Sequence, residues 1–178
     1  NYLFARKHGG TFVLRIEDTD RQRYVAEAEQ DMLDSLVWAG LSYDEGPNVG
    51  GAYGPYYQSH RKEIYKNYVD LLVADGHAYY AFDSKEELDA MRTRLTTPEN
   101  HSPKYDMVSR QSMKNSFTMD AAAVQEKIDS GAEYFVRLTV PEDEQIQFDD
   151  LVRGVVSFAS SEVDDQILLK SDGMPTYH

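Results

Sequence analysis

The stretch TFVLRIEDTD, residues 11–20, decides the fold that we predict for this chain. Its first half is mostly β-branched, aromatic or aliphatic and follows Gly9 and Gly10, which is typical of a short buried strand. Three carboxylates come directly after it, at Glu17, Asp18 and Asp20. Because ligands bind beyond the carboxyl ends of strands in an open parallel sheet, these carboxylates mark the first candidate site.

Helical patterns lie on both sides of this stretch. Residues 1–8 read as the end of an amphipathic helix, which Gly9 terminates. A second helix is predicted from Tyr24 to Ala39, with an inward stripe that includes Val25, Met32 and Leu36. The order helix, strand, helix predicts an α/β layer built on a parallel sheet.

The remainder of the chain predicts a second unit that begins near residue 60. Ser59 is expected to cap a helix over 60–74, and Ser84 with Glu87 forms a capping box for a helix over 85–94. Residues 96–115 are polar and show no periodicity. A further helix is predicted over 121–130, and strands are predicted over 77–82, 134–140, 146–148, 155–158 and 166–170.

Composition excludes several classes of protein. The formal net charge of −13 argues against sequence-blind binding of polyanions, and the absence of cysteine excludes disulfides and thiolate zinc sites. The first eight residues do not show the pattern of a signal peptide, so none is expected, and no apolar run approaches the ~20 residues that cross a bilayer. We expect a cytoplasmic protein with no membrane partner. Because the chain opens inside a helical pattern without an initiator Met, we also expect an excised fragment of a larger parent.

Position alone leaves the role of the carboxylates open. They can hold an ammonium group or a magnesium ion, or they can simply decorate a helix N-terminus. A third reading is an aspartate-dependent phosphotransferase that uses Asp18 and Asp20. The residue two positions after Asp20 is Gln22, where those enzymes place a small hydroxyl or β-branched residue.

Eight short blocks, spread from the first stretch to the last residue, carry a family resemblance. They are RIEDTDR with Arg23-Tyr24, then LVWAGL at 36–41, YDEGP at 43–47, GPYYQS at 54–59, GHAY at 76–79, VRL at 136–138, RG at 153–154 and LLKSDGMPTYH at 168–178. In this order they resemble the glutamyl-tRNA synthetases, which are class I enzymes.

The resemblance implies an α/β fold, a partial Rossmann-like catalytic domain with an inserted α+β subdomain that binds the tRNA acceptor stem. The catalytic domain would comprise residues 1–62, the insertion 63–160 and the return to the catalytic domain 161–178. The parent would be a monomer that activates glutamate with ATP and Mg²⁺ to glutamyl-adenylate. It would then transfer the glutamyl group to the 3′-terminal adenosine of tRNA(Glu).

The resemblance also implies roles for four residues. Glu17 would contact the amino group of bound glutamate, and Tyr177 would line the same pocket. Asp20 and Arg23 would lie near the tRNA 3′ end, although a solvated charge in the first helical turn explains Arg23 equally well. No catalytic residue is expected, because the ATP-binding signatures of the family are absent from the 178 residues. We therefore expect this chain alone not to activate glutamate.

Two comparisons with relatives concern a zinc site and the tRNA substrate. Some relatives carry zinc-binding cysteines shortly after the block at 76–79, where this chain has Ala81 and Asp83, so zinc is predicted to be absent. A paralogue that glutamylates a modified base of tRNA(Asp), glutamyl-Q tRNA(Asp) synthetase, has Leu-Asp-Pro in place of Thr19-Asp20-Arg21. That difference favours the tRNA-charging enzyme. Basic residues that could touch the acceptor stem are Lys62, Lys66, Arg92, Arg94, Lys104, Arg110 and Lys114.

Overall fold

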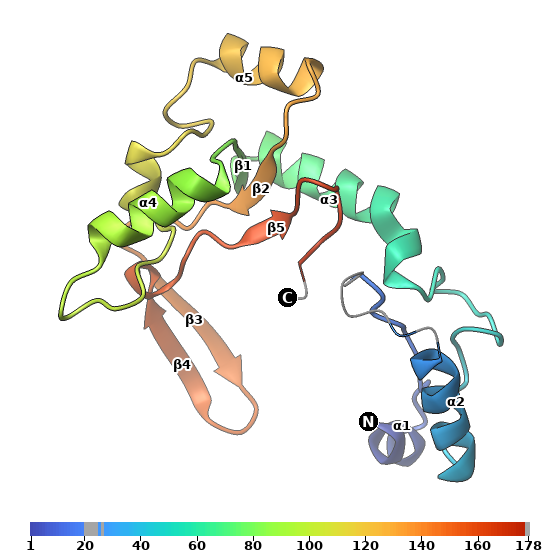
Figure 1. Ribbon diagram of the computed structural model, residues 1–178. Helices are drawn as coiled ribbons and strands as arrows, with labels where there is room; N and C mark the ends of the chain where they lie inside the picture. The colour runs from blue at the N-terminus through green and yellow to red at the C-terminus, as the bar shows by residue number, and fades with distance from the viewer. Residues whose placement is uncertain (20–24, 26, 177–178) are drawn as a thin grey trace. The chain divides into compact units, whose positions relative to one another are not determined.

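The computed structural model describes residues 1–19, 25 and 27–176. These residues form two compact units, residues 1–65 and residues 66–176, which we call unit 1 and unit 2. The helix α3 (Lys62–Ala74) contains the boundary between them (Figure 1). Among the described residues no helix is long and apolar enough to cross a membrane.

Unit 1 contains two helices, α1 (Tyr2–His8) and α2 (Ala28–Trp38), and a 3₁₀ turn (Gln58–Arg61). The prediction that Gly9 ends the first helix is confirmed. Gly9 has φ 65°, and its N–H donates to the Ala5 carbonyl. This left-handed conformation carries little steric cost only in a residue without a Cβ.

The predicted strand over 11–16 is present only in part. Val13 forms a parallel bridge with Glu45, and Ile16 forms a parallel bridge with Tyr57. The parallel arrangement of the expected α/β layer is therefore found, but as single bridges and not as a continuous ladder. The prediction that this strand is buried is wrong, since Val13 is 42% exposed.

The expected inward stripe of the second helix is not buried either. Val25 is 62% exposed and Met32 is 36% exposed, and none of the residues of α2 is buried. A helix buries an apolar stripe only against a layer that covers it. Within the described part of unit 1, the three chain segments joined by single bridges do not form such a layer.

Unit 2 is built on antiparallel strands. β1 (Ala78–Ala81), β2 (Phe135–Leu138) and β5 (Ile167–Leu169) form a sheet in the order β1-β2-β5. β3 (Gln145–Asp150) and β4 (Gly154–Ala159) form a separate hairpin, which extends away from the three-stranded sheet (Figure 1). Residues 161–178 are expected to return to the catalytic domain. β5 lies within this range, and in the structure it pairs with β2 of unit 2.

The helices of unit 2 follow the predicted positions. α4 (Lys85–Leu95) begins at the predicted capping box, in which Glu87 Oε2 accepts from the Ser84 N–H at 2.9 Å and Ser84 Oγ accepts from the Glu87 N–H at 3.3 Å. α5 (Ala121–Asp129) begins after Asp120, whose side chain makes no cap hydrogen bond. Both helices begin where the sequence predicts.

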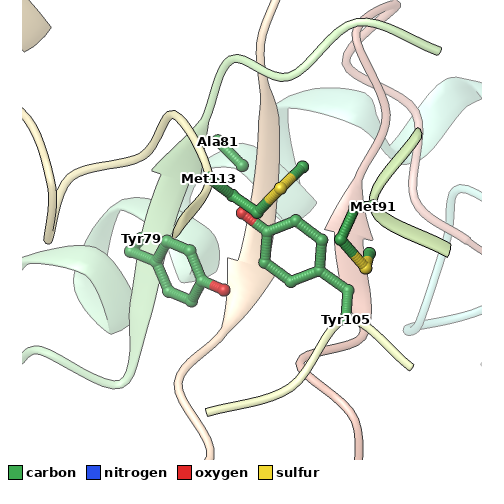
Figure 2. Packing of buried hydrophobic residues seen from close by; sticks show 5 residues of the cluster. All are labelled: Tyr79, Ala81, Met91, Tyr105 and Met113. Atoms are coloured by element: carbon green, nitrogen blue, oxygen red, sulfur yellow. The ribbon is translucent and has the colours of Figure 1, made fainter. Parts of the chain in front are cut away.

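The apolar core of unit 2 gathers side chains from three segments. Figure 2 shows Tyr79 and Ala81 of β1 beside Met91 of α4 and beside Tyr105 and Met113. Tyr105 and Met113 belong to the polar segment 96–115, in which the sequence shows no periodicity. The cluster fixes α4 on one face of β1, since alternate residues of a strand point to the same face.

A buried polar centre accompanies this cluster. The Asp165 carboxylate, which is inaccessible to solvent, accepts from Tyr79 Oη at 2.6 Å, from Arg110 Nη1 at 3.1 Å and from the Val140 N–H at 3.1 Å. Arg137 Nη1 donates to the Asp165 carbonyl at 2.8 Å. Burial and the hydrogen bond to Asp165 raise the pKa of Tyr79 well above its ordinary value. A buried charge of this kind requires such partners.

Candidate functional site

The candidate site lies where two parallel segments of unit 1 end. The Ile16 N–H donates to the Tyr56 carbonyl at 2.8 Å, and the Gln58 N–H donates to the Ile16 carbonyl at 2.8 Å. Because the two segments run in the same direction, their carboxyl ends meet at one edge. This edge carries Glu17 and Asp18 from one segment and Ser59 from the other. The structure thus places Glu17 and Asp18 at the end of a bridged extended segment, as predicted, whereas Asp20 lies outside the described residues.

Asp18 is engaged by a residue 41 positions away in the chain. Ser59 donates twice to its carboxylate, from the backbone N–H to Oδ1 at 2.8 Å and from Oγ to Oδ2 at 2.5 Å. Burial alone would raise the pKa of Asp18, but these two hydrogen bonds, together with the backbone of Asp18 and the nearby His60, lower the pKa below its ordinary value. Asp18 is therefore an anchoring carboxylate whose two oxygens both have donors.

The same contact overturns the predicted role of Ser59. Ser59 lies inside the 3₁₀ turn and not at an N-cap, and its hydroxyl serves Asp18. A hydroxyl that donates to a carboxylate makes a charge-assisted bond, which is stronger than a bond to a neutral cap partner. The Ser59 hydroxyl does not cap a helix, because the fold brings the Asp18 carboxylate within hydrogen-bonding distance of it.

Glu17 differs from Asp18 in its accessibility. Glu17 Oε1 accepts from Arg15 Nη2 at 2.7 Å, and the two side chains are 36% and 38% exposed. An exposed ion pair contributes about 0–1 kcal/mol, so a second cation can compete for this carboxylate at small cost. Glu17 is thus accessible to a cationic ligand, whereas Asp18 is occupied.

The other three predicted site residues are Asp20, Arg23 and Tyr177. All three lie outside the described residues. Their assignment to the tRNA end and to the glutamate pocket stays a prediction.

Glu45 is a buried carboxylate that the sequence does not single out. It is 6% exposed and lies in the Gly-rich loop at 44–55, where it accepts from the Tyr56 hydroxyl and from the Tyr53 N–H at 2.6 Å. These hydrogen bonds, that of Tyr56 above all, lower the pKa of Glu45. A Cβ on Gly51 would lie 2.2 Å from Glu45 Cγ, so glycine is required there. Glu45 therefore fixes the loop that leads into the 56–58 segment.

The neighbouring carboxylate, Asp44, connects this loop to the start of the chain. Its Oδ2 accepts from Arg6 Nη1 at 2.6 Å and from the Phe12 N–H at 2.8 Å. The hydrogen bond from Arg6 is the main reason why the pKa of Asp44 is lowered. The motif YDEGP shows two acids side by side, and only the fold shows that each has a separate set of partners.

Most of the basic residues considered for the acceptor stem have partners within unit 2. Arg110 is 5% exposed and belongs to the Asp165 centre, so it is not available for such a contact. Partners of the exposed residues are Asp70 for Lys66, Asp89 for Arg92, Ser112 for Arg94, the Glu162 carbonyl for Lys104 and Glu87 for Lys114.

The two positions relevant to zinc have other roles here. Ala81 belongs to the apolar cluster, and Asp83 accepts from Tyr105 Oη at 2.9 Å and from the Lys114 N–H at 2.7 Å. Across residues 1–19, 25 and 27–176 there is no group of three His, Cys, Asp or Glu side chains that could hold a metal ion. The expectation about zinc in the protein stays a prediction.

Comparison with known families decides the class to which these residues belong. The family described as class I tRNA synthetases (E and Q), catalytic domain, matches residues 1–178. The chain belongs to this family. The predicted class I catalytic fold is thereby confirmed at the level of a mixed α/β domain.

Within this family, the chain is similar to individual glutamate–tRNA ligases. The glutamate–tRNA ligases of Cytophaga hutchinsonii and Amoebophilus asiaticus are each 52% identical to this chain over 178 residues, which is all of the chain and 34% and 35% of their own lengths. A crystal structure of a glutamate tRNA ligase from Elizabethkingia meningosepticum, in complex with its amino acid, superposes with a TM-score of 0.91 at 40% identity. It covers 99% of this chain and 35% of that one. The chain thus spans about a third of the length of the relatives that it matches.

Proposed function

We propose that this chain is part of the catalytic region of a glutamate–tRNA ligase. The reaction would form glutamyl-adenylate from glutamate and ATP with Mg²⁺, with release of pyrophosphate, and would then transfer the glutamyl group to the 3′-terminal adenosine of tRNA(Glu) with release of AMP. The observation that carries the proposal is the accessible carboxylate of Glu17 at the end of two parallel segments, within a chain that glutamate–tRNA ligases match along its full length.

Glu17 is the proposed ligand of the substrate amino group. A carboxylate and an ammonium group form a charge-assisted hydrogen bond. Arg15 already holds one oxygen of Glu17 with a cationic donor, which supports the affinity of this position for positive charge. Tyr177 would supply a flat wall with one polar tip to the same pocket, and Asp20 and Arg23 would lie by the tRNA end.

The domain division follows from the same proposal. Residues 1–62 and 161–178 would belong to the catalytic domain, and residues 63–160 would form the insertion that binds the acceptor stem. Compact units over 1–65 and 66–176 support a change of structural unit close to the first of these boundaries. The proposed parent is a monomeric cytoplasmic enzyme without zinc.

Two alternatives are less well supported. The paralogue that acts on a modified base of tRNA(Asp) is disfavoured by Thr19-Asp20-Arg21 and by the names of the relatives. A phosphotransferase with Asp18 as nucleophile is disfavoured by geometry. Both oxygens of Asp18 accept hydrogen bonds from Ser59, which lower its pKa and its nucleophilicity.

Pyrophosphate exchange tests the proposal in the full-length protein that contains this chain. Exchange is expected to require glutamate together with tRNA(Glu). Release of phosphate from a monoester in place of this exchange would refute the proposal.

The Glu17→Gln variant tests the assigned contact. Loss of a hydrogen bond to a charged group is expected to raise the KM for glutamate on the order of 10- to 100-fold and to leave the KM for ATP nearly unchanged. The control is Glu63→Gln, an exposed acid on α3, which is expected to change neither constant. An equal rise of both constants in Glu17→Gln would mean that Glu17 is structural.

A further inference from the structure

The contact between Ser59 and Asp18 lies directly beside the proposed amino-group ligand. Backbone hydrogen bonds tie Ile16 to the 56–58 segment up to the Gln58 N–H. Beyond this last backbone bond, the two hydrogen bonds from Ser59 to Asp18 join the same two segments again. Glu17 is therefore the residue between two anchored neighbours, Ile16 on one side and Asp18 on the other.

Ser59 constrains Asp18 more strongly than a single bond would. Its N–H and its Oγ approach different oxygens of one carboxylate, so the carboxylate plane as well as its position is fixed. Since Asp18 follows Glu17 directly, this also restricts the backbone from which the Glu17 side chain extends. Among the described residues, the Glu17 side chain itself is held only by the exposed pair with Arg15.

We propose that Ser59 is a positioning residue, which orients the Glu17 carboxylate toward the substrate amino group by fixing Asp18. This inference rests on the proposed function. A carboxylate held in its binding orientation before the ligand arrives does not lose conformational freedom on binding, and this saving appears as affinity. The loss of affinity is expected for glutamate and not for ATP, because the proposed ligand of Glu17 is the amino group of glutamate.

The experiment measures the KM values for glutamate and ATP by pyrophosphate exchange in the full-length enzyme. Ser59→Ala removes the Oγ bond and is expected to raise the KM for glutamate about tenfold, with the KM for ATP unchanged. Ser59→Thr retains a hydroxyl and is expected to restore the wild-type value. Asp18→Asn is expected to have a small effect, because its amide can still accept from the Ser59 N–H and donate to Oγ.

The matched control is Ser35→Ala. The Ser35 hydroxyl donates to the Asp31 carbonyl at 2.7 Å within α2, so this variant also removes one serine hydrogen bond from unit 1. It is expected to leave both constants unchanged.

A double-variant cycle separates positioning from general stabilisation. If Ser59 acts through Glu17, Ser59→Ala adds little to the KM for glutamate in a Glu17→Gln background, whereas independent effects would add in full. Additive effects, an unchanged KM for glutamate in Ser59→Ala, or an equal rise of both KM values with a lower Tm would each overturn the inference. If Ser59→Ala does not fold, Ser59→Cys, with its weaker donor, gives the same comparison.

The wild-type enzyme distinguishes this inference from the proposed function. Absence of glutamate-dependent exchange in the wild type would refute the proposed function. Exchange in the wild type with a normal KM in Ser59→Ala would refute only the positioning role.

Discussion

Units 1 and 2 are stabilised by different kinds of contact. All the buried hydrophobic side chains of the described chain lie in unit 2, between Val69 and Leu169. In unit 1 the buried side chains include the polar Glu45 and Gln58, and separate segments are joined by carboxylates. These joints are Asp18 with Ser59, Asp44 with Arg6 and Phe12, and Glu45 with Tyr53 and Tyr56.

The difference shows where the proposed site obtains its geometry. Unit 2 combines non-directional apolar packing with the buried Asp165 centre, whereas the described segments of unit 1 are joined mainly by hydrogen bonds to carboxylates, which specify distances and angles. The candidate site lies in the unit that depends on directional contacts. Its geometry is therefore expected to respond to the loss of single polar atoms and to pH, whereas unit 2 is expected to respond to the loss of buried volume or buried charge.

The largest effect is expected from Asp165→Asn in unit 2. The amide cannot accept from all the donors that now meet the carboxylate, and it leaves the buried Arg110 with only its longer pair to the exposed Glu142, at 3.4 Å, among the described residues. We expect the free energy of unfolding to fall by about 4 kcal/mol in urea titrations. The control Asp164→Asn, a partly exposed neighbour, is expected to stay within about 0.5 kcal/mol of the wild type. A similar loss in both variants would contradict the role of Asp165.

A smaller loss is expected from Met91→Ala in the apolar cluster. Met91 is 2% exposed and packs with Tyr79 and Tyr105, so its truncation removes apolar contacts and leaves a cavity. We expect the free energy of unfolding to fall by about 3 kcal/mol. Leu71→Ala removes a similar side chain that is 60% exposed, and it is expected to cost less than about 0.5 kcal/mol. Equal losses would mean that the cluster does not stabilise unit 2.

The smallest effect is a local opening of unit 1 in acid. The pKa values of Asp18, Asp44 and Glu45 are lowered by folding. Their contribution to stability is therefore complete above the ordinary pKa values of 3.8 for Asp and 4.5 for Glu, and it is lost as the pH falls through the lowered folded values. Hydrogen exchange at decreasing pH is expected to show earlier loss of protection at Ile16 and Gln58 than at Val136 of unit 2.

A triple variant provides the control for this acid step. Replacement of all three carboxylates by Ala, which leaves no acceptor for these donors, is expected to open the same segments at neutral pH and to remove the pH dependence. Simultaneous loss of protection in both units during acidification would contradict the distinction between them.

Local sequence signals predict the structure correctly where the interacting residues are close in the chain. The capping box of Ser84 and Glu87 joins residues three positions apart, and the turn at Gly9 depends on its own backbone. The segment 96–115 could not be predicted for the opposite reason. Its polar Asn115 is fully buried, and its amide donates to the Arg110 carbonyl at 2.7 Å and to Tyr105 Oη at 3.2 Å. Neither contact produces a periodic pattern of apolar residues in the sequence.

The sequence by itself determined the family, the starts of α4 and α5 and the position of Glu17 and Asp18 at the end of the 11–16 stretch, because these depend on the order of residues along the chain. Only the tertiary structure decided what each carboxylate does. Asp18 is bound by Ser59, Asp44 by Arg6 and Phe12, and Glu45 by Tyr53 and Tyr56, whereas Glu17 is accessible. These acids look alike in sequence, and their roles diverge because the donors that reach them are brought close in space by the fold.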